Sequence, residues 1–126
     1  MAQPADLLYT KEHEWVRVDG DVATVGITDY AQNSLGDIVY VELPKTGANV
    51  AQFSSVGVVE SVKAVSDLFS PVGGEVIEVN GSLESDPAMV NREPYHGGWM
   101  FKVKLGDGAQ TGGLLSPGDY EKLVSQ

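Results

Sequence analysis

The sequence predicts a mainly β fold, an antiparallel β-sandwich with a few short peripheral helices. Six short runs are rich in Val, Ile and aromatic residues, and Gly or Asp interrupts them at short intervals. Several runs, such as "EVIEV" and "FKVKL", alternate apolar and polar residues, which is typical of antiparallel strands that bury one face. The 126 residues suffice for one core, so residues 1–126 are expected to form a single domain.

The predicted strands, in chain order, are "EWVRV" (14–18), "DVATVGI" (21–27), "DIVYVEL" (37–43), "SSVGVVESV" (54–62), "GEVIEVN" (74–80) and "WMFKVKL" (99–105). Two Gly-containing segments, "VDGD" and "VGGE", are typical of hairpin turns. A faint repeat relates "GDVATV" to "GEVIEV" and "DIVYVEL" to "WMFKVKL". It predicts that each half of the chain supplies one set of strands, giving two sheets packed face to face.

Three short helices fit between and after these strands. They cover "DYAQNSL" (29–35), "SDPAMVN" (85–91) and "SPGDYEKLV" (116–124). The predicted N-caps are Thr28, then Ser85 or Asp86, and finally Ser116, because their side chains can accept hydrogen bonds from free amides of the first turn. Gly36 is expected to end the first helix. The Gly-rich "GDGAQTGGLL" (106–115) is expected to be a loop.

Composition and charge exclude several classes of function. The net charge of −10 disfavours binding to nucleic acid or to anionic membrane surfaces and suits a partner protein with a basic surface. The chain has no cysteine, so it has no disulfide, no zinc–thiolate site and no cysteine nucleophile. No catalytic or metal-ligating residue is expected, since no serine-hydrolase, zinc-protease or phosphate-binding motif is present.

The N-terminal residues "MAQPADLLYTKEHEW" have neither the pattern of a secretory signal nor that of an Arg-rich transit peptide. No run approaches the ~18 apolar residues of a membrane span. We therefore expect a cytoplasmic protein of a bacterium, or a mitochondrial matrix protein whose transit peptide has been removed.

Lys63 is the one basic residue between Thr46 and Asn91, a window that contains six acidic residues. The segment "VKAV" has no Gly or Asn, so a turn there is expected to keep negative φ angles, as in a type I turn. Three interpretations of Lys63 remain open from these residues alone. It is a solubility lysine at a hairpin tip, a Schiff-base lysine in a desolvated pocket, or a lysine presented for covalent modification.

The segment "ESVKAVSD" followed by "SPVGGEVIEVN" resembles the lipoyl-attachment region of the glycine cleavage system H protein family. The resemblance extends through "YTKEHEWV", "VGITDYAQNSLGDIVYVELP" and the residues from "MVNREPY" to "FKVKL", which together cover most of the chain. It implies a barrel-sandwich hybrid of the lipoyl/biotinyl-carrier type. It also implies that Lys63 carries (R)-lipoate in amide linkage.

The resemblance further implies a carrier and not an enzyme. In the family's cycle the lipoyl group accepts the aminomethyl group of glycine from glycine decarboxylase, a pyridoxal-phosphate enzyme, and delivers it to a folate-dependent aminomethyltransferase. Dihydrolipoamide dehydrogenase then takes the electrons, and a lipoate–protein ligase or lipoyl transferase attaches the cofactor. The implied partners are therefore these enzymes, with no nucleic acid and no membrane.

Further site candidates follow from the resemblance and from charge. Glu14 and Asp67 are candidates for a cleft that shelters the cationic amine of the loaded arm, and Glu60 and Asp67 are candidates for docking of partners. His13 is expected to be a structural hydrogen-bonding residue. The segment "AQFSS" departs from the family's usual hairpin here, which is expected to leave Phe53 exposed.

Two related carrier classes are alternatives. A lipoyl domain of a 2-oxo acid dehydrogenase complex, or a protein that relays lipoate to such complexes, would also present a lipoyl-lysine; against the former, no Pro/Ala-rich linker is present. Biotin carriers favour methionines beside the lysine, where this chain has Val62 and Ala64.

Overall fold

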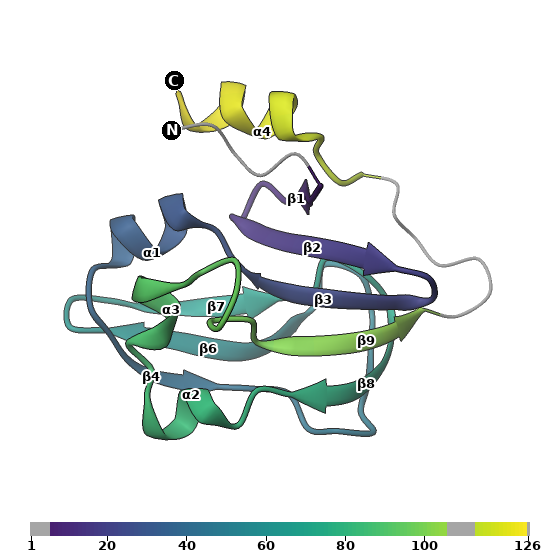
Figure 1. The fold of residues 1–126 in the computed structure, drawn as a ribbon, viewed down its shortest axis with the longest axis horizontal. Helices are drawn as coiled ribbons and strands as arrows, with labels where there is room; N and C mark the ends of the chain where they lie inside the picture. The colour runs from purple at the N-terminus through teal and green to yellow at the C-terminus, as the bar shows by residue number, and fades with distance from the viewer. Residues whose placement is uncertain (1–5, 106–112, 126) are drawn as a thin grey trace.

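The computed structural model describes residues 6–105 and 113–125 and shows two antiparallel sheets (Figure 1). The larger sheet has the strand order β1 (Leu8–Tyr9), β2 (Glu14–Asp19), β3 (Val22–Ile27), β9 (Phe101–Leu105), β8 (Gly74–Val79) and β5 (Asn49–Val50). The smaller sheet has the order β4 (Ile38–Glu42), β6 (Ser55–Ser61) and β7 (Val65–Phe69). The predicted mainly β, antiparallel fold is confirmed.

The main core lies between the two sheets. The larger sheet contributes alternate residues such as Val25 and Phe101, and the smaller one contributes Val41, Val59 and Leu68, all of them buried. Alternation places these side chains on the inner face of each sheet. Each fully buried Val, Leu or Phe side chain stabilises the fold by roughly 1.5–3 kcal/mol relative to an exposed one.

A second, smaller core packs helix α4 (Pro117–Val124) against the N-terminal strands. Its buried members are Leu7, Tyr9, Trp15 and Tyr120. The rings of Tyr9 and Tyr120 stack with centroids 4.6 Å apart, and the Trp15 indole N–H donates to the Pro94 carbonyl over 2.8 Å. This core covers the side of β2 that faces away from the smaller sheet, and Figure 1 shows α4 lying above β1 and β2.

The six predicted strands are present, and the structure adds three whose residues were not assigned, although a strand was expected on each side of the Lys63 turn. Two of these, β1 and β5, contain only two residues each, which is too short for an alternating pattern to be detected. The third, β7, follows the Lys63 turn, and its first three residues are all exposed. The start of this strand therefore has no alternating pattern of buried and exposed side chains.

The predicted hairpin at "VGGE" is wrong, because this segment leads from β7 in the smaller sheet to β8 in the larger one. The internal repeat predicts only in part which strands lie together in a sheet. Its first pair, β3 and β8, lies in one sheet on either side of β9, whereas its second pair, β4 and β9, is divided between the sheets. The larger sheet therefore combines strands from both halves of the chain.

Two predicted helices are confirmed with their caps. Helix α1 (Asp29–Leu35) begins after Thr28, whose hydroxyl accepts from the Ala31 amide over 3.2 Å, and ends at Gly36, where φ is +82°. At α4 the Ser116 hydroxyl accepts from the Asp119 amide over 3.2 Å. Both caps satisfy amides that have no partner within the helix.

The predicted helix over 85–91 is wrong, and so is its cap at Ser85 or Asp86. Two single-turn helices, α2 (Ser82–Ser85) and α3 (Met89–Arg92), replace it, neither with a side-chain cap. Asp86 ends α2 with φ −141°. Pro87 explains why α2 ends at Asp86, because a proline disfavours helical geometry in the residue before it and has no amide to donate.

None of the helices in the described parts of the chain is both long and apolar enough to cross a membrane. Most of the predicted Gly-rich loop, residues 106–112, lies outside the described residues.

Candidate functional site

Lys63 lies at the tip of the β6–β7 hairpin and its side chain is exposed. The neighbouring Val62 and Val65 are 68% and 66% exposed, so the tip carries an amine between apolar side chains that face solvent. Apart from glycines, the described residues have positive φ only at His13 and Phe53. The prediction of negative φ angles across the Lys63 turn is therefore confirmed.

Ser61 closes this turn, a role that sequence reasoning missed. Its buried hydroxyl accepts from the amides of Lys63 and Ala64 over 3.3 and 3.1 Å, and its own amide donates to the Ala64 carbonyl over 2.8 Å. Serine hydroxyls commonly bond to backbone amides two or three residues ahead. That local tendency was the one available signal, and it is shared by many serines that do not close turns.

The tip is also attached to the neighbouring strand and helix. The Val62 amide donates to the Asp37 carbonyl over 3.1 Å. The Lys63 side chain lies close to Gly36, since a β-carbon added to Gly36 would lie 3.7 Å from Lys63 Cε. The α1–β4 junction thus holds the backbone just before the lysine and lies against the lysine side chain near its end.

Asn91 holds the junction between α1 and β4 on which the tip rests. Its amide nitrogen donates to the Gly36 carbonyl over 2.8 Å and to Gln32 Oε1 over 2.9 Å, and its oxygen accepts from the Ile38 amide over 2.9 Å. A side chain with its groups bonded on three sides has little freedom, so it fixes the support of Lys63. Sequence reasoning did not identify Asn91 either, because its partners lie more than fifty residues away in the chain.

Glu60 and Asp67 lie on the outer face of the smaller sheet. Glu60 of β6 lies between Tyr40 of β4 and Val65 of β7. Asp67 is two residues beyond Val65 and therefore projects on the same side of β7. Both predicted docking residues thus lie on one face of the sheet, next to the tip. Apolar side chains lie on the same face, and one of them, Tyr40, is 50% exposed.

Glu14 is buried at the start of β2, only 2% exposed. Its Oε1 accepts from the Thr10 hydroxyl over 2.6 Å, and its Oε2 accepts from the Phe69 amide over 3.3 Å. Burial raises the pKa of Glu14 to about 7, although these two hydrogen bonds favour the charged form. The carboxyl group therefore links β2 of one sheet to the end of β7 in the other.

Glu14 forms part of the wall of a cavity of about 320 Å³. The lining residues are Thr10, Lys11, Glu12, Glu14, Phe53, Phe69 and Gly113. Asp67 is not among them, but β7 places it two residues before Phe69 on the same side of the strand. Asp67 therefore lies between the Lys63 tip and the cavity, and the two predicted cleft residues do not line one wall.

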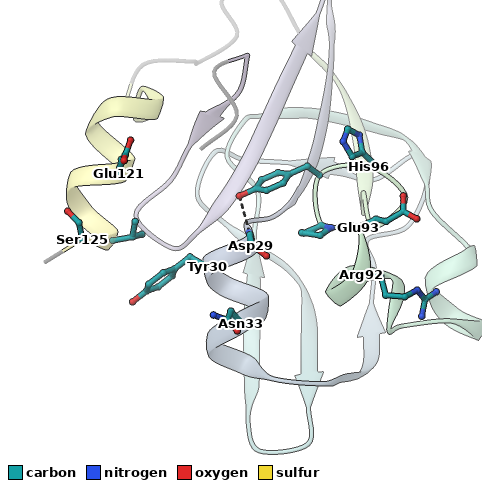
Figure 2. Close-up of a pocket in the computed structure, with 11 residues that line it drawn as sticks. Asp29, Tyr30, Asn33, Arg92, Glu93, His96, Glu121 and Ser125 are labelled. Carbon is teal, nitrogen blue, oxygen red and sulfur yellow. Dashed lines mark hydrogen bonds between the residues drawn. The ribbon is translucent and has the colours of Figure 1, made fainter. Parts of the chain in front are cut away.

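A larger cavity, about 650 Å³, lies between α1, α4 and residues 92–96 (Figure 2). Figure 2 shows its charged and aromatic side chains, and the Tyr95 hydroxyl accepts from the Asp29 amide over 3.0 Å. Neither Lys63 nor Glu14 lines this cavity. His96 of its wall is exposed.

His13 joins the second core to this region. Its Nδ1 is 2.9 Å from the Tyr120 hydroxyl, which is also 2.7 Å from the Thr28 hydroxyl that caps α1. Burial lowers the pKa of His13. The prediction of a structural hydrogen-bonding role is confirmed by these contacts.

Comparisons of the chain with a family model, with protein sequences and with solved structures all indicate the same family. The model of the glycine cleavage H-protein family matches residues 7–126. The chain belongs to the glycine cleavage H-protein family. The glycine cleavage system H protein of Carboxydothermus hydrogenoformans is 54% identical over 123 residues, which are 98% of this chain and 95% of that protein. The H protein of Opitutus terrae is 57% identical over 122 residues, 96% of each chain.

The crystal structure of a glycine cleavage system H protein from Mycobacterium marinum superimposes with a TM-score of 0.91. It is 38% identical, and the match covers 98% of this chain and 100% of that one. Members of the H-protein family are lipoyl carriers of the glycine cleavage system and not enzymes, so the expectation of a carrier is confirmed.

The residues at the tip fit the lipoyl group of an H protein. Amide formation needs a primary amine that an attaching enzyme can reach, and Lys63 is exposed on a backbone that Ser61 fixes. The small side chain of Ala64 lies on one side of the lysine.

Proposed function

We propose that this chain, as a single lipoyl-carrier domain over residues 1–126, carries lipoate on Lys63 and serves the glycine cleavage system. The observation that carries the proposal is the exposed amine on a turn closed by Ser61. The lipoyl group supplies, when attached, a disulfide that accepts an aminomethyl group and a dithiol that gives up electrons. A chain without cysteine has no such group of its own.

An extended lipoyl arm and the strand β7 are similar in length. An extended chain advances ~1.2 Å per bond, so the ~12 bonds from the Lys63 Cα to the lipoyl sulfur span ~14 Å. The strand β7 rises ~3.3 Å per residue, so the ~5 residues from the turn to Phe69 span ~16 Å. Residues on the outer side of β7 therefore lie along the path of the arm.

Glu14 is the group proposed to hold the cationic amine of the cargo. Thr10 and the Phe69 amide orient its carboxyl oxygens, and its burial in the cavity strengthens electrostatic attraction relative to water. A cation beside it would favour the charged carboxylate and lower its pKa from about 7. Asp67 would attract the same amine on its way, because it projects from β7 toward solvent between the turn and the cavity.

The proposed partners are glycine decarboxylase, the aminomethyltransferase, dihydrolipoamide dehydrogenase and the enzyme that attaches lipoate. The net charge of −10 and the carboxylates Glu60 and Asp67 beside the tip support docking to basic surfaces, because complementary charge speeds association. We place the cycle in the cytoplasm, because the relatives named above are bacterial proteins.

The test is lipoylation of the wild type and of Lys63→Arg by a competent ligase. Arginine keeps the charge and cannot form the lipoyl amide, so the variant should gain no lipoyl mass while its melting temperature stays unchanged. Tryptic mass spectrometry should place the lipoyl group of the wild type on Lys63. Lipoate on another lysine, or none on the wild type, would refute the assignment.

Reconstitution with the three partner enzymes then tests the role of the lipoylated protein. Glycine-dependent reduction of NAD⁺ through the dehydrogenase should require the wild-type chain and fail with Lys63→Arg. Failure of the lipoylated wild type in this assay, together with transfer of its lipoyl group to lipoyl domains of 2-oxo acid dehydrogenases, would instead indicate lipoate relay.

A further inference from the structure

Phe53 combines two features that are each uncommon. Its φ angle is +65°, and His13 is the one other non-glycine residue with positive φ in the described parts of the chain. Its ring is also 48% exposed. A bulky residue in the left-handed region loses on the order of 1–2 kcal/mol relative to an ordinary backbone conformation. A strained backbone and an exposed apolar side chain at one position point to a role other than stability.

The surrounding backbone holds Phe53 in this conformation. Its amide donates to the Ser70 carbonyl over 2.6 Å, and the Ser70 amide donates in return to the Ser54 carbonyl over 2.9 Å. The ring lies against Gly113, since a β-carbon added there would be 3.5 Å from the Phe53 Cζ. Gly113 itself has φ +86°. Two hydrogen bonds and a side-chain-free neighbour thus fix the direction of the ring.

The ring lines the same cavity as Glu14. A second aromatic residue, Phe69, lines it as well, and the charged residues of the wall are Glu14, Glu12 and Lys11. Two carboxyl groups, one ammonium group and two aromatic rings favour a small organic cation. The carboxylate attracts the charge, and an aromatic face attracts an ammonium group through its quadrupole.

We propose that Phe53 is a positioning residue of the arm cavity, whose ring encloses the ammonium end of the cargo beside Glu14. The inference rests on the proposed function of the cavity and goes beyond it by naming the aromatic contribution. The ligand class is a primary ammonium group on a short thioether, because the cargo is an amine joined to sulfur through one carbon. Leucine at this position would exclude water equally well and would lack the attraction for the cation.

The test uses the full-length chain before lipoylation and a stable probe, 2-(methylthio)ethylamine, with its neutral analogue methyl propyl sulfide. NMR titration should show the cation binding to the wild type with shifts at Glu14, Phe53 and Phe69. Phe53→Leu should weaken binding of the cation by about three- to tenfold and leave that of the neutral sulfide nearly unchanged. Ile77→Ala, which alters another partly exposed apolar residue outside the cavity, is the matched control and should bind both probes as the wild type does.

Two further variants separate the ring from its backbone. Phe53→Ala and Phe53→Gly both remove the ring, and glycine adopts a positive φ without strain. The glycine variant should therefore melt about 2–5 °C above the alanine variant, while both bind the cation equally weakly. Equal melting temperatures would overturn the claim that the ring is held against the backbone preference.

The outcomes distinguish this inference from the proposed function. If Glu14→Gln abolishes binding of the cation and Phe53→Leu does not weaken it, the cavity stands and the role of Phe53 is wrong. If Phe53→Leu weakens the neutral sulfide as much as the cation, the ring acts as apolar surface only and the positioning role is again wrong. If the wild type binds neither probe, the arm cavity itself is refuted, and the role of Phe53 with it.

Discussion

The two ends of strand β7 differ in almost every physical respect. At the first end Lys63 projects into solvent between exposed valines, and a serine hydroxyl accepts from its backbone amide. At the second end Phe69 bonds to a buried carboxyl group inside a cavity. A carrier needs both environments, because an attaching enzyme must reach the amine while an unstable cargo needs exclusion from water. One strand of five residues separates the two tasks.

The largest expected effect is the pH dependence of stability that Glu14 causes at the second end of β7. The folded state holds the Glu14 proton up to about pH 7, whereas the unfolded chain loses it near 4.5. Between these values the folded state binds more protons, so the Glu14 contribution to the free energy of unfolding falls as pH rises. The loss should be on the order of 3 kcal/mol by pH 7.5.

Chemical denaturation of the wild type and of Glu14→Gln from pH 4.5 to 8 measures this effect, because the difference between the two profiles cancels the other carboxyl groups. Glutamine cannot ionise, so the wild type should lose stability relative to the variant as pH rises. Thr10→Val gives a second test, because it removes a hydrogen bond that favours the charged form of Glu14. The pKa of Glu14 should rise, and the fall in stability should extend to higher pH. Parallel profiles for the wild type and Glu14→Gln would contradict the assignment.

The next prediction concerns the Lys63 end and should show a large effect on rate with little effect on stability. Inserting one glycine on either side of Lys63 changes the spacing from Ser61 to the amides that its hydroxyl binds, so presentation of the lysine is lost. Lipoylation should slow by about tenfold, which is ~1.4 kcal/mol in the barrier. Surface changes outside the core usually alter stability by less than ~0.5 kcal/mol, so the melting temperature should barely move.

A glycine inserted next to Gly20, in the β2–β3 turn, is the matched control, because a β-carbon added to Gly20 would meet no other part of the chain within 4 Å. It should leave the lipoylation rate unchanged. Mass spectrometry of timed samples gives the rates for the wild type, the two Lys63 insertions and the control. Equal rates for the Lys63 insertions and the wild type would show that the ligase recognises the lysine without a fixed turn.

The same contrast explains which parts of the site could be predicted from the sequence. Lys63 stood out because its charge is isolated, and the resemblance in the flanking segments predicted that it carries lipoate. Glu14 was named, but its burial was not predicted, because the covering residues Thr10 and Phe69 come from a loop and from the other sheet. The exposure of Phe53 was expected and is confirmed, whereas its positive φ had no signal, since glycine usually occupies such positions.

At the level of the fold, long alternating strands and capped helices were predictable because their causes are local. The predictions were wrong where contacts between residues distant in the chain determine the structure. The helix predicted over 85–91 begins only at Met89 and has no side-chain cap, and "VGGE" resembles a hairpin although its strands lie in different sheets. Ser61 belongs to the same class, because its importance depends on a burial that the sequence does not reveal.

The smallest expected effect tests Ser61 itself and asks how much of the rigidity at the Lys63 end comes from one hydroxyl group. Ser61→Ala removes a hydroxyl that accepts from two amides, and the loss of these hydrogen bonds should lower stability by about 1 kcal/mol. Lipoylation should slow by about two- to threefold, less than for the insertions, since both flanking strands keep their register. Ser54→Ala removes another hydroxyl that bonds within a loop, to the Ala51 carbonyl, and should leave the rate unchanged. A Ser61→Ala rate as low as that of the insertions would assign the presentation of Lys63 to this hydroxyl alone, whereas a wild-type rate would assign it to the strands.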